Sequence, residues 1–223
     1  YVKLLDKNDS MGYTGVGKVY LLHPKSDIDI KTGLKYLEMA YEQGHLGAAQ
    51  DFIQFNLIPE QTPTLENFKS PNFPNRKLAL KMFYELSKNP EAIGFVENLL
   101  SISALSDVLN VDEVNELIKN LRKIANQNIE DSSNLAATIL SDLYASNVFV
   151  QKNLTEQIYY LKLAADRNDL TAAVNLGWLY FDINKFDESR KYMLQGLKTR
   201  DPYLKAYAYN NFGVLENFSS NNK

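Results

Sequence analysis

Small, large apolar and aromatic residues recur along the chain at helical spacing. Between residues 134 and 214, an alanine is followed three positions later by a leucine next to a small residue, and then by a tyrosine. The two clearest copies are Ala137, Leu140, Ser141, Tyr144 and Ala173, Leu176, Gly177, Tyr180. The small residues Ser141, Gly177 and Gly213 are 36 residues apart. Such a period is typical of stacked helical pairs, each too small to bury its own apolar face.

The same phase is present at the front of the chain. Gly17 is followed by Tyr20, and Ile53 lies 36 residues after Gly17. Val96 takes the small-residue position at a wider spacing, and the pattern then indicates six first helices and five second helices with no useful strand alternation. We therefore predict an all-α, right-handed solenoid of stacked antiparallel helix pairs. Gly17 and Gly177 are expected where helices of neighbouring pairs approach closely.

Residues 59–74 interrupt this pattern. They hold four prolines and little periodicity. Proline removes a backbone donor and clashes in a helix interior, so the segment is predicted to be an irregular insertion. The remainder is predicted to form one repeat domain over residues 1–223.

Helix-boundary residues are placed as the repeat requires. Gly44 is expected to end one helix, and Asn153 with Glu156 three residues later resembles a capping box. Asp169 or Asn168 is expected to cap the helix that follows.

The repeat resembles the Sel-one-like repeat (SLR) family, which is related to the tetratricopeptide repeats. The matching first-helix residues are Ala173, Leu176, Gly177 and Tyr180. The second half is matched at Asp29, Leu34, Tyr36, Ala40, Gly44 and Ala48, and again at Tyr160, Lys162, Ala164 and Ala165. The resemblance covers residues 12–56 and 134–215. The chain departs from the family at Ser141, Ile53, Val96 and Asn168, where glycine is expected.

The resemblance implies a function in binding. Similar proteins are mostly bacterial, frequently exported, and act as adaptors, and some are immunity proteins that hold a secreted toxin inactive. It therefore implies a non-catalytic protein–protein interaction module, periplasmic or otherwise exported, with a cytoplasmic location as the alternative. The alternative functions are a tetratricopeptide-like receptor for a short peptide or chain terminus, and an enzyme of unrecognised type.

Composition excludes several partners. The net charge is −3 and no basic run stands out, so we expect no nucleic-acid partner. No apolar run approaches the length of about 18 residues that a membrane span needs. The sequence has no cysteine, and His23 and His45 lack a clustered third ligand, so neither a metal nor a cofactor is expected.

No catalytic motif accounts for the residues better than the repeat does. Residues 12–18 match G-x-x-x-x-G-K, but Val19 occupies the position where a phosphate loop carries Ser or Thr. The same residues fit the repeat phase. No G-x-S-x-G motif occurs. We therefore expect no catalytic residues and no enzymatic activity.

The first helices of such a solenoid line its concave face. If tetratricopeptide geometry transfers, groove positions lie three before, one after and four after the small residue. We expect a monomer that binds one protein or peptide partner there. The predicted contacts are Lys18, Gln54, Glu97, Asp142, Trp178, Phe181 and Asn210. The alternative for Trp178 and Phe181 is packing against the adjacent repeat.

Overall fold

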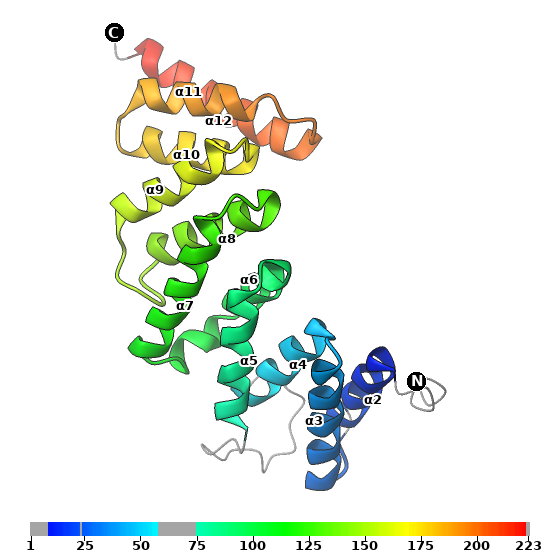
Figure 1. Ribbon diagram of the computed structural model, residues 1–223. Coiled ribbons are helices and arrows are strands. Elements are labelled where there is room, and N and C mark those ends of the chain that lie inside the picture. Colours follow the sequence, from blue (N-terminus) through cyan, green and yellow to red (C-terminus); the bar gives the residue numbers. More distant parts are fainter. Residues whose placement is uncertain (1–8, 23, 58–74, 222–223) are drawn as a thin grey trace. The chain divides into compact units, whose positions relative to one another are not determined.

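The computed structural model describes residues 9–22, 24–57 and 75–221, and every regular element within them is helical. Eleven α-helices and two 3-10 helices account for these elements, and no strand occurs among the described residues (Figure 1). This confirms the predicted all-α fold of stacked helix pairs. The α-helices are α2 (Ser10–Leu22), α3 (Asp27–Glu42), α4 (Leu46–Leu57), α5 (Arg76–Lys88), α6 (Ile93–Leu100), α7 (Val111–Ala125), α8 (Glu130–Ala145), α9 (Leu154–Ala165), α10 (Leu170–Asp182), α11 (Phe186–Gly196) and α12 (Pro202–Asn221).

The chain divides into two compact units, Tyr1–Asn120 and Leu121–Lys223, which we call the first unit and the second unit. In the first unit, α2 packs against α3, α3 against α4, α4 against α5, and α6 against both α4 and α5. The predicted single domain stays a prediction, and the insertion predicted at 59–74 lies outside the described residues.

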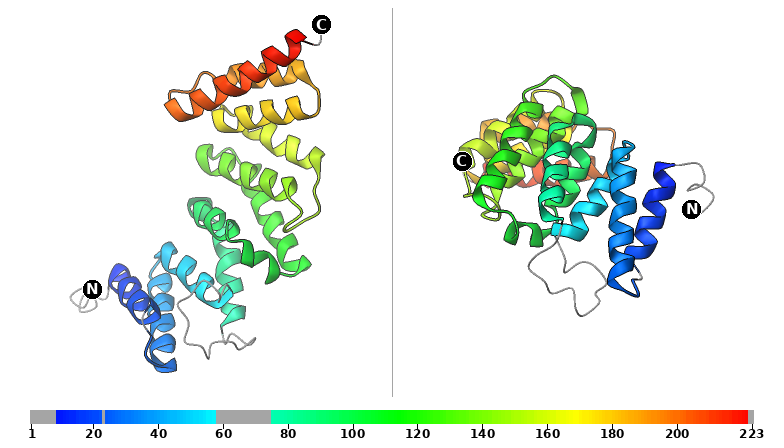
Figure 2. Two further views of the ribbon diagram at one scale, coloured as in Figure 1. Left: turned by 180° about the vertical axis from the view of Figure 1, so that it is seen from behind. Right: turned by 60° about the horizontal axis from the view of Figure 1, so that its bottom comes forward.

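The second unit repeats this arrangement with shorter connections. Helix α8 packs against α9, α10 against both α9 and α11, and α12 against α10 and α11. Figure 2 shows α10, α11 and α12 lying side by side from a second direction. The cores of the two units are built from apolar residues on the facing helix sides, among which Ala and Leu are the most frequent.

The glycines of the repeat mark close approaches inside one helix pair. A β-carbon on Gly17 would lie 2.9 Å from the carbonyl oxygen of Gly33 on α3. A β-carbon on Gly177 would lie 2.7 Å from Met193 Cγ and 3.0 Å from the backbone nitrogen of Met193 on α11. The expectation that these glycines lie where helices of neighbouring pairs approach each other is therefore wrong. They bring the two helices of the same pair together.

The tyrosine of the repeat also packs between the two helices of one pair. Tyr20 stacks on Tyr36 with ring centroids 6.2 Å apart, and Tyr144 stacks on Tyr160 at the same distance. In the second unit, Tyr180 stacks on Tyr192 with centroids 5.7 Å apart. Each stack joins a first helix to its second helix, so these aromatic rings are packing residues.

Side-chain caps set the helix boundaries. Asp169 accepts from the amide of Ala172, as predicted, and Asn168 instead takes a φ of 66°. Asn168 thus supplies the left-handed turn that Gly44 supplies elsewhere with a φ of 87°. Asn153 accepts from the amides of Thr155 and Glu156, but its own amide donates to the Tyr144 carbonyl. Only the asparagine half of the predicted capping box is therefore made.

Candidate partner-binding surface

One position of the repeat faces solvent, wholly or partly, in all six first helices. It is the residue directly after the small residue, and the six residues are Lys18, Gln54, Glu97, Asp142, Trp178 and Val214. This phase was predicted to face the groove. Four of the six are exposed, and Gln54 and Trp178 are half-buried.

The other two predicted phases do not behave in this way. Three residues before the small residue lie Ile93 and Val174, which are buried in the cores of their units. Four residues after it lie Leu21 and Leu57, which are also buried. These four residues are therefore closed to a partner, whereas Phe181, in the second of these phases, is half-buried. Asn210 belongs to the first of these phases and is exposed.

In the first unit, the outward positions are polar and the lysine is neutralised. Lys18 Nζ lies 2.8 Å from Asp51 Oδ2 on α4. Burial raises the pKa of Asp51, and the neighbouring Lys18 ammonium opposes that rise. The positive charge predicted at Lys18 is therefore balanced by Asp51 of the same chain. Gln54 and Glu97 complete the outward set of this unit.

His45 lies beside this ion pair and has a structural role. Its Nδ1 accepts from the amide of Ala48 at 3.2 Å and lies 3.2 Å from Thr14 Oγ1. A ring nitrogen that accepts from a backbone amide is unprotonated. His45 thus fixes the start of α4 against α2.

In the second unit, four aromatic rings form a continuous cluster that we call the aromatic cluster. Trp178 stacks on Phe181 with centroids 5.2 Å apart. Phe181 contacts Phe186 at 5.9 Å and Phe218 at 5.6 Å, and Phe186 contacts Phe218 at 5.4 Å. Phe218 is 42% exposed and the other three rings are half-buried. The cluster therefore joins α10, α11 and α12 and keeps part of each ring in contact with water.

Sequence reasoning found half of this cluster. Trp178 and Phe181 follow from the phase of the first helix. Phe186 starts a second helix and Phe218 lies five residues after Gly213, so neither belongs to the phases we considered. The signal that could have found them is the packing of α12 on α10 and α11, which places residue 218 beside residues 181 and 186.

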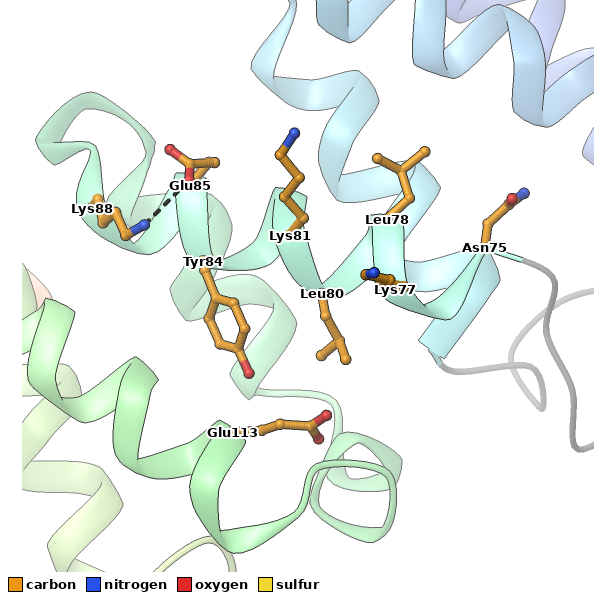
Figure 3. Close-up of a pocket in the computed structure, with 9 residues that line it drawn as sticks. All are labelled: Asn75, Lys77, Leu78, Leu80, Lys81, Tyr84, Glu85, Lys88 and Glu113. Atoms are coloured by element: carbon orange, nitrogen blue, oxygen red, sulfur yellow. Dashed lines mark hydrogen bonds and ion pairs between the residues drawn. The ribbon is translucent and has the colours of Figure 1, made fainter.

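A separate pocket lies on α5 in the first unit. It has a volume of about 730 Å³ and is lined by Asn75, Lys77, Leu78, Leu80, Lys81, Tyr84, Glu85, Lys88 and Glu113. Figure 3 shows Leu80 and Tyr84 directed toward Glu113, with Leu78 and Lys81 on the opposite side of the helix. Lys88 pairs with Glu85 at 3.2 Å. Lys77 and Lys81 are exposed beside apolar side chains, a combination that the sequence prediction missed.

An ion pair fixes one wall of this pocket. Arg76 donates from Nη1 and Nη2 to the two carboxylate oxygens of Glu113, each at 2.8 Å, and Nη2 also donates to the Val108 carbonyl at 3.0 Å. The guanidinium holds the pKa of Glu113 below its usual value, and burial raises the pKa of Tyr84 beside it. Bidentate geometry of this kind ties α5 to α7.

Other kinds of site are not evident in the part of the chain that the structure describes. There, no three His, Cys, Asp or Glu side chains come together as a metal site would require. Within the same ranges, no helix is both long and apolar enough to cross a membrane.

Comparison with known proteins adds distant structural similarity. No protein-family model matches the chain, and a search of curated proteins found no match. One similar solved structure is a protective antigen present in uropathogenic Escherichia coli strains, which displays an SLR fold. It is 12% identical with a TM-score of 0.48, and the alignment covers 96% of this chain and 42% of that one. The chain thus spans less than half of that protein, and the helical-repeat fold rests on the helices described above.

Proposed function

We propose that this chain is a non-catalytic protein-interaction module whose main contact is the aromatic cluster of the second unit. The supporting observation is the partial exposure of four mutually packed rings from three helices. Packed rings lose little side-chain entropy on binding and bury a large area, which is why aromatic residues dominate binding hot spots. Trp178 and Phe181 are the central contacts, and Asp142 and Asn210 are the polar contacts that set register.

In the first unit, we propose Lys18, Gln54 and Glu97 as polar contacts for a partner. Lys18 is held by Asp51, so it presents a neutral ion pair, whereas Glu97 presents an exposed carboxylate. A pair that is already made inside the chain adds little affinity and favours neutral or polar contacts. This division gives the proposed partner an apolar segment for the second unit and polar groups for the first.

The finer proposal is that the partner is a secreted toxin and that the chain is an exported immunity or adaptor protein. Its support is the resemblance of residues 12–56 and 134–215 to the SLR family. The direct test is growth of a bacterial host that expresses the captured partner with and without this chain. Rescue of growth supports neutralisation, and equal growth in both cultures contradicts it.

A peptide receptor is the second candidate, and the pocket on α5 favours it. Lys77 and Lys81 flank apolar side chains in a pocket of about 730 Å³, which suits a short peptide with an apolar side chain next to a carboxylate. Lys77→Glu with Lys81→Glu should abolish binding of such a peptide and leave the aromatic-cluster partner unaffected. Binding of the partner that depends on these lysines would favour the receptor function over the proposed one.

The central experiment uses the chain as bait in its source lysate, followed by affinity measurement with the purified partner. Trp178→Ala should weaken binding by about 2 kcal/mol, or roughly thirtyfold. Tyr159→Ala is the matched control, because Tyr159 is an aromatic residue of the same unit that is 51% exposed outside the cluster. If Trp178→Ala melts like wild type and binds equally well, the aromatic cluster is not the contact.

A further inference from the structure

The outward stripe of α10 places an acidic residue directly beside the tryptophan of the aromatic cluster. The stripe consists of Thr171, Asn175, Trp178 and Asp182, of which Trp178 is half-buried and the others are exposed. Because Trp178 and Asp182 are four residues apart on one helix, their β-carbons lie on the same face, about 5–6 Å from each other. A group that contacts the accessible part of the indole is therefore within reach of the Asp182 carboxylate.

Asp182 does not stabilise the helix in which it lies. It is the last residue of α10, where the negative end of the helix dipole disfavours a carboxylate. The basic residues that follow it in the chain are engaged elsewhere. Lys185 lies over the Tyr180 ring at 5.9 Å, and Arg190 pairs with Glu216 at 2.8 Å. Asp182 thus keeps a negative charge at the surface that no described cation balances.

The first helices around this site carry only negative charge. Helices α8 and α10 together contain four acidic residues and no lysine or arginine, the acidic residues being Glu130, Asp131, Asp142 and Asp182. Their paired second helices, α9 and α11, hold three basic residues. A surface of one sign of charge attracts the opposite sign and repels its own. The charge on these first helices therefore favours a cationic partner.

We propose that the segment bound by the aromatic cluster carries an arginine, whose guanidinium stacks on Trp178 and pairs with Asp182. This inference rests on the function proposed above and adds a charge to the apolar segment of the partner. Among aromatic side chains, tryptophan attracts a cation most strongly. Arginine suits the site better than lysine, because its planar guanidinium can stack on a ring and donate two hydrogen bonds to one carboxylate.

The rings beside Trp178 favour an arginine within a protein segment over a free cation. Phe181 and Phe186 are half-buried and contact each other with centroids 5.9 Å apart. A free cation would leave their accessible surface in water, whereas a segment covers it with the apolar side chains that flank the arginine. A nucleic acid is disfavoured, because its phosphates would be repelled by the acidic residues of α8 and α10.

The first test compares three synthetic peptides that carry leucines around one variable residue, which is arginine, lysine or citrulline. Citrulline has the shape of arginine without its charge. Binding to the whole chain is followed by the NMR shifts of the α10 amides. The arginine peptide should bind with a Kd on the order of 1 mM, since a single cation–π contact and one exposed ion pair are each weak. The lysine peptide should bind about threefold more weakly and the citrulline peptide at least about tenfold more weakly.

The second test changes the site. Asp182→Asn should weaken the arginine peptide and the captured partner at least about fivefold, and it should melt at the same or a higher temperature than wild type. A merely structural role for Asp182 would instead lower the melting temperature. Asp131→Asn is the matched control, because it removes the same charge from an exposed residue at the far end of α8, and it should bind like wild type.

The outcomes separate this inference from the proposed function. Equal binding of the arginine and citrulline peptides, or no binding of the arginine peptide below about 10 mM, overturns the arginine. So does a captured partner that Trp178→Ala weakens and Asp182→Asn does not, although the aromatic contact then stands. A captured partner that Trp178→Ala leaves unaffected contradicts the proposed function itself.

Discussion

Helices α10 and α12 occupy the same place in the repeat but have opposite surroundings. In α10, Val174 and Gly177 are buried against α11, and Trp178 points outward. In α12, the equivalent residues are Asn210, Gly213 and Val214, and all three are exposed. The difference shows that the environment of a repeat position is set by whether a second helix packs on it. The place in the repeat by itself predicts exposure only for the residue directly after the small residue.

The largest effect on stability should come from exchanging the residues at the equivalent positions 174 and 210. Val174→Asn places an amide in the closed contact between α10 and α11, where a β-carbon on Gly196 would already clash with the valine methyl. We expect a loss of about 3 kcal/mol in the free energy of unfolding, measured by urea denaturation. Asn210→Val, the reverse exchange on α12, should change stability by less than about 0.5 kcal/mol. Similar losses from both would show that α12 is packed like α10.

An alkaline pH series tests the contact between α10 and α11 through Tyr192, which stacks on Tyr180. Burial raises the pKa of Tyr192 to about 12, so the folded state favours the neutral phenol. This stability is fully present below the unfolded pKa of about 10 and is lost as pH rises toward the folded pKa. Tyr192→Phe should therefore reduce the loss between these two pH values by on the order of 2 kcal/mol.

Tyr209→Phe on α12 is the control for this series, because Tyr209 is 57% exposed. It should leave the alkaline loss of stability unchanged. The outcome that contradicts the comparison is an equal effect of both substitutions.

The smallest expected change in the free energy of unfolding should have opposite signs in α10 and α12. Gly177→Ala adds a β-carbon 2.7 Å from Met193 Cγ and 3.0 Å from its backbone nitrogen, so the helices must separate. We expect a loss of about 1–2 kcal/mol. Gly213→Ala adds the same atom to open space and should gain roughly 0.5–1 kcal/mol, because alanine favours the helix. Thermal melts of the two variants at low protein concentration check this, and shifts of the same sign would be the contrary result.

The sequence predicted the fold because the residues that recur in the repeat are those that pack inside one helix pair. Gly17, Gly177 and the stacked tyrosines recur at fixed spacing, and their contacts span a single pair. The caps are equally local, since Asp169 contacts an amide three residues away. Such interactions are readable without knowledge of the wider packing.

The candidate site was only partly predictable because it depends on contacts between pairs. Phe218 joins the aromatic cluster through the packing of α12 on α10 and α11, and no local spacing indicates this. The neutralisation of Lys18 depends on Asp51, which lies on a helix of the next pair. Phase alone also could not separate Val174, which is buried, from Asn210, which is exposed.

Trp178 is the only tryptophan of the sequence, so its fluorescence reports on the proposed binding surface alone. The most direct test of the account is acrylamide quenching of this indole in the free chain and with the captured partner. We predict efficient quenching in the free chain and clear protection in the complex, with Trp178→Phe supplying the background from partner tryptophans. An indole that resists quenching in the free chain and is unchanged by the partner would contradict the account.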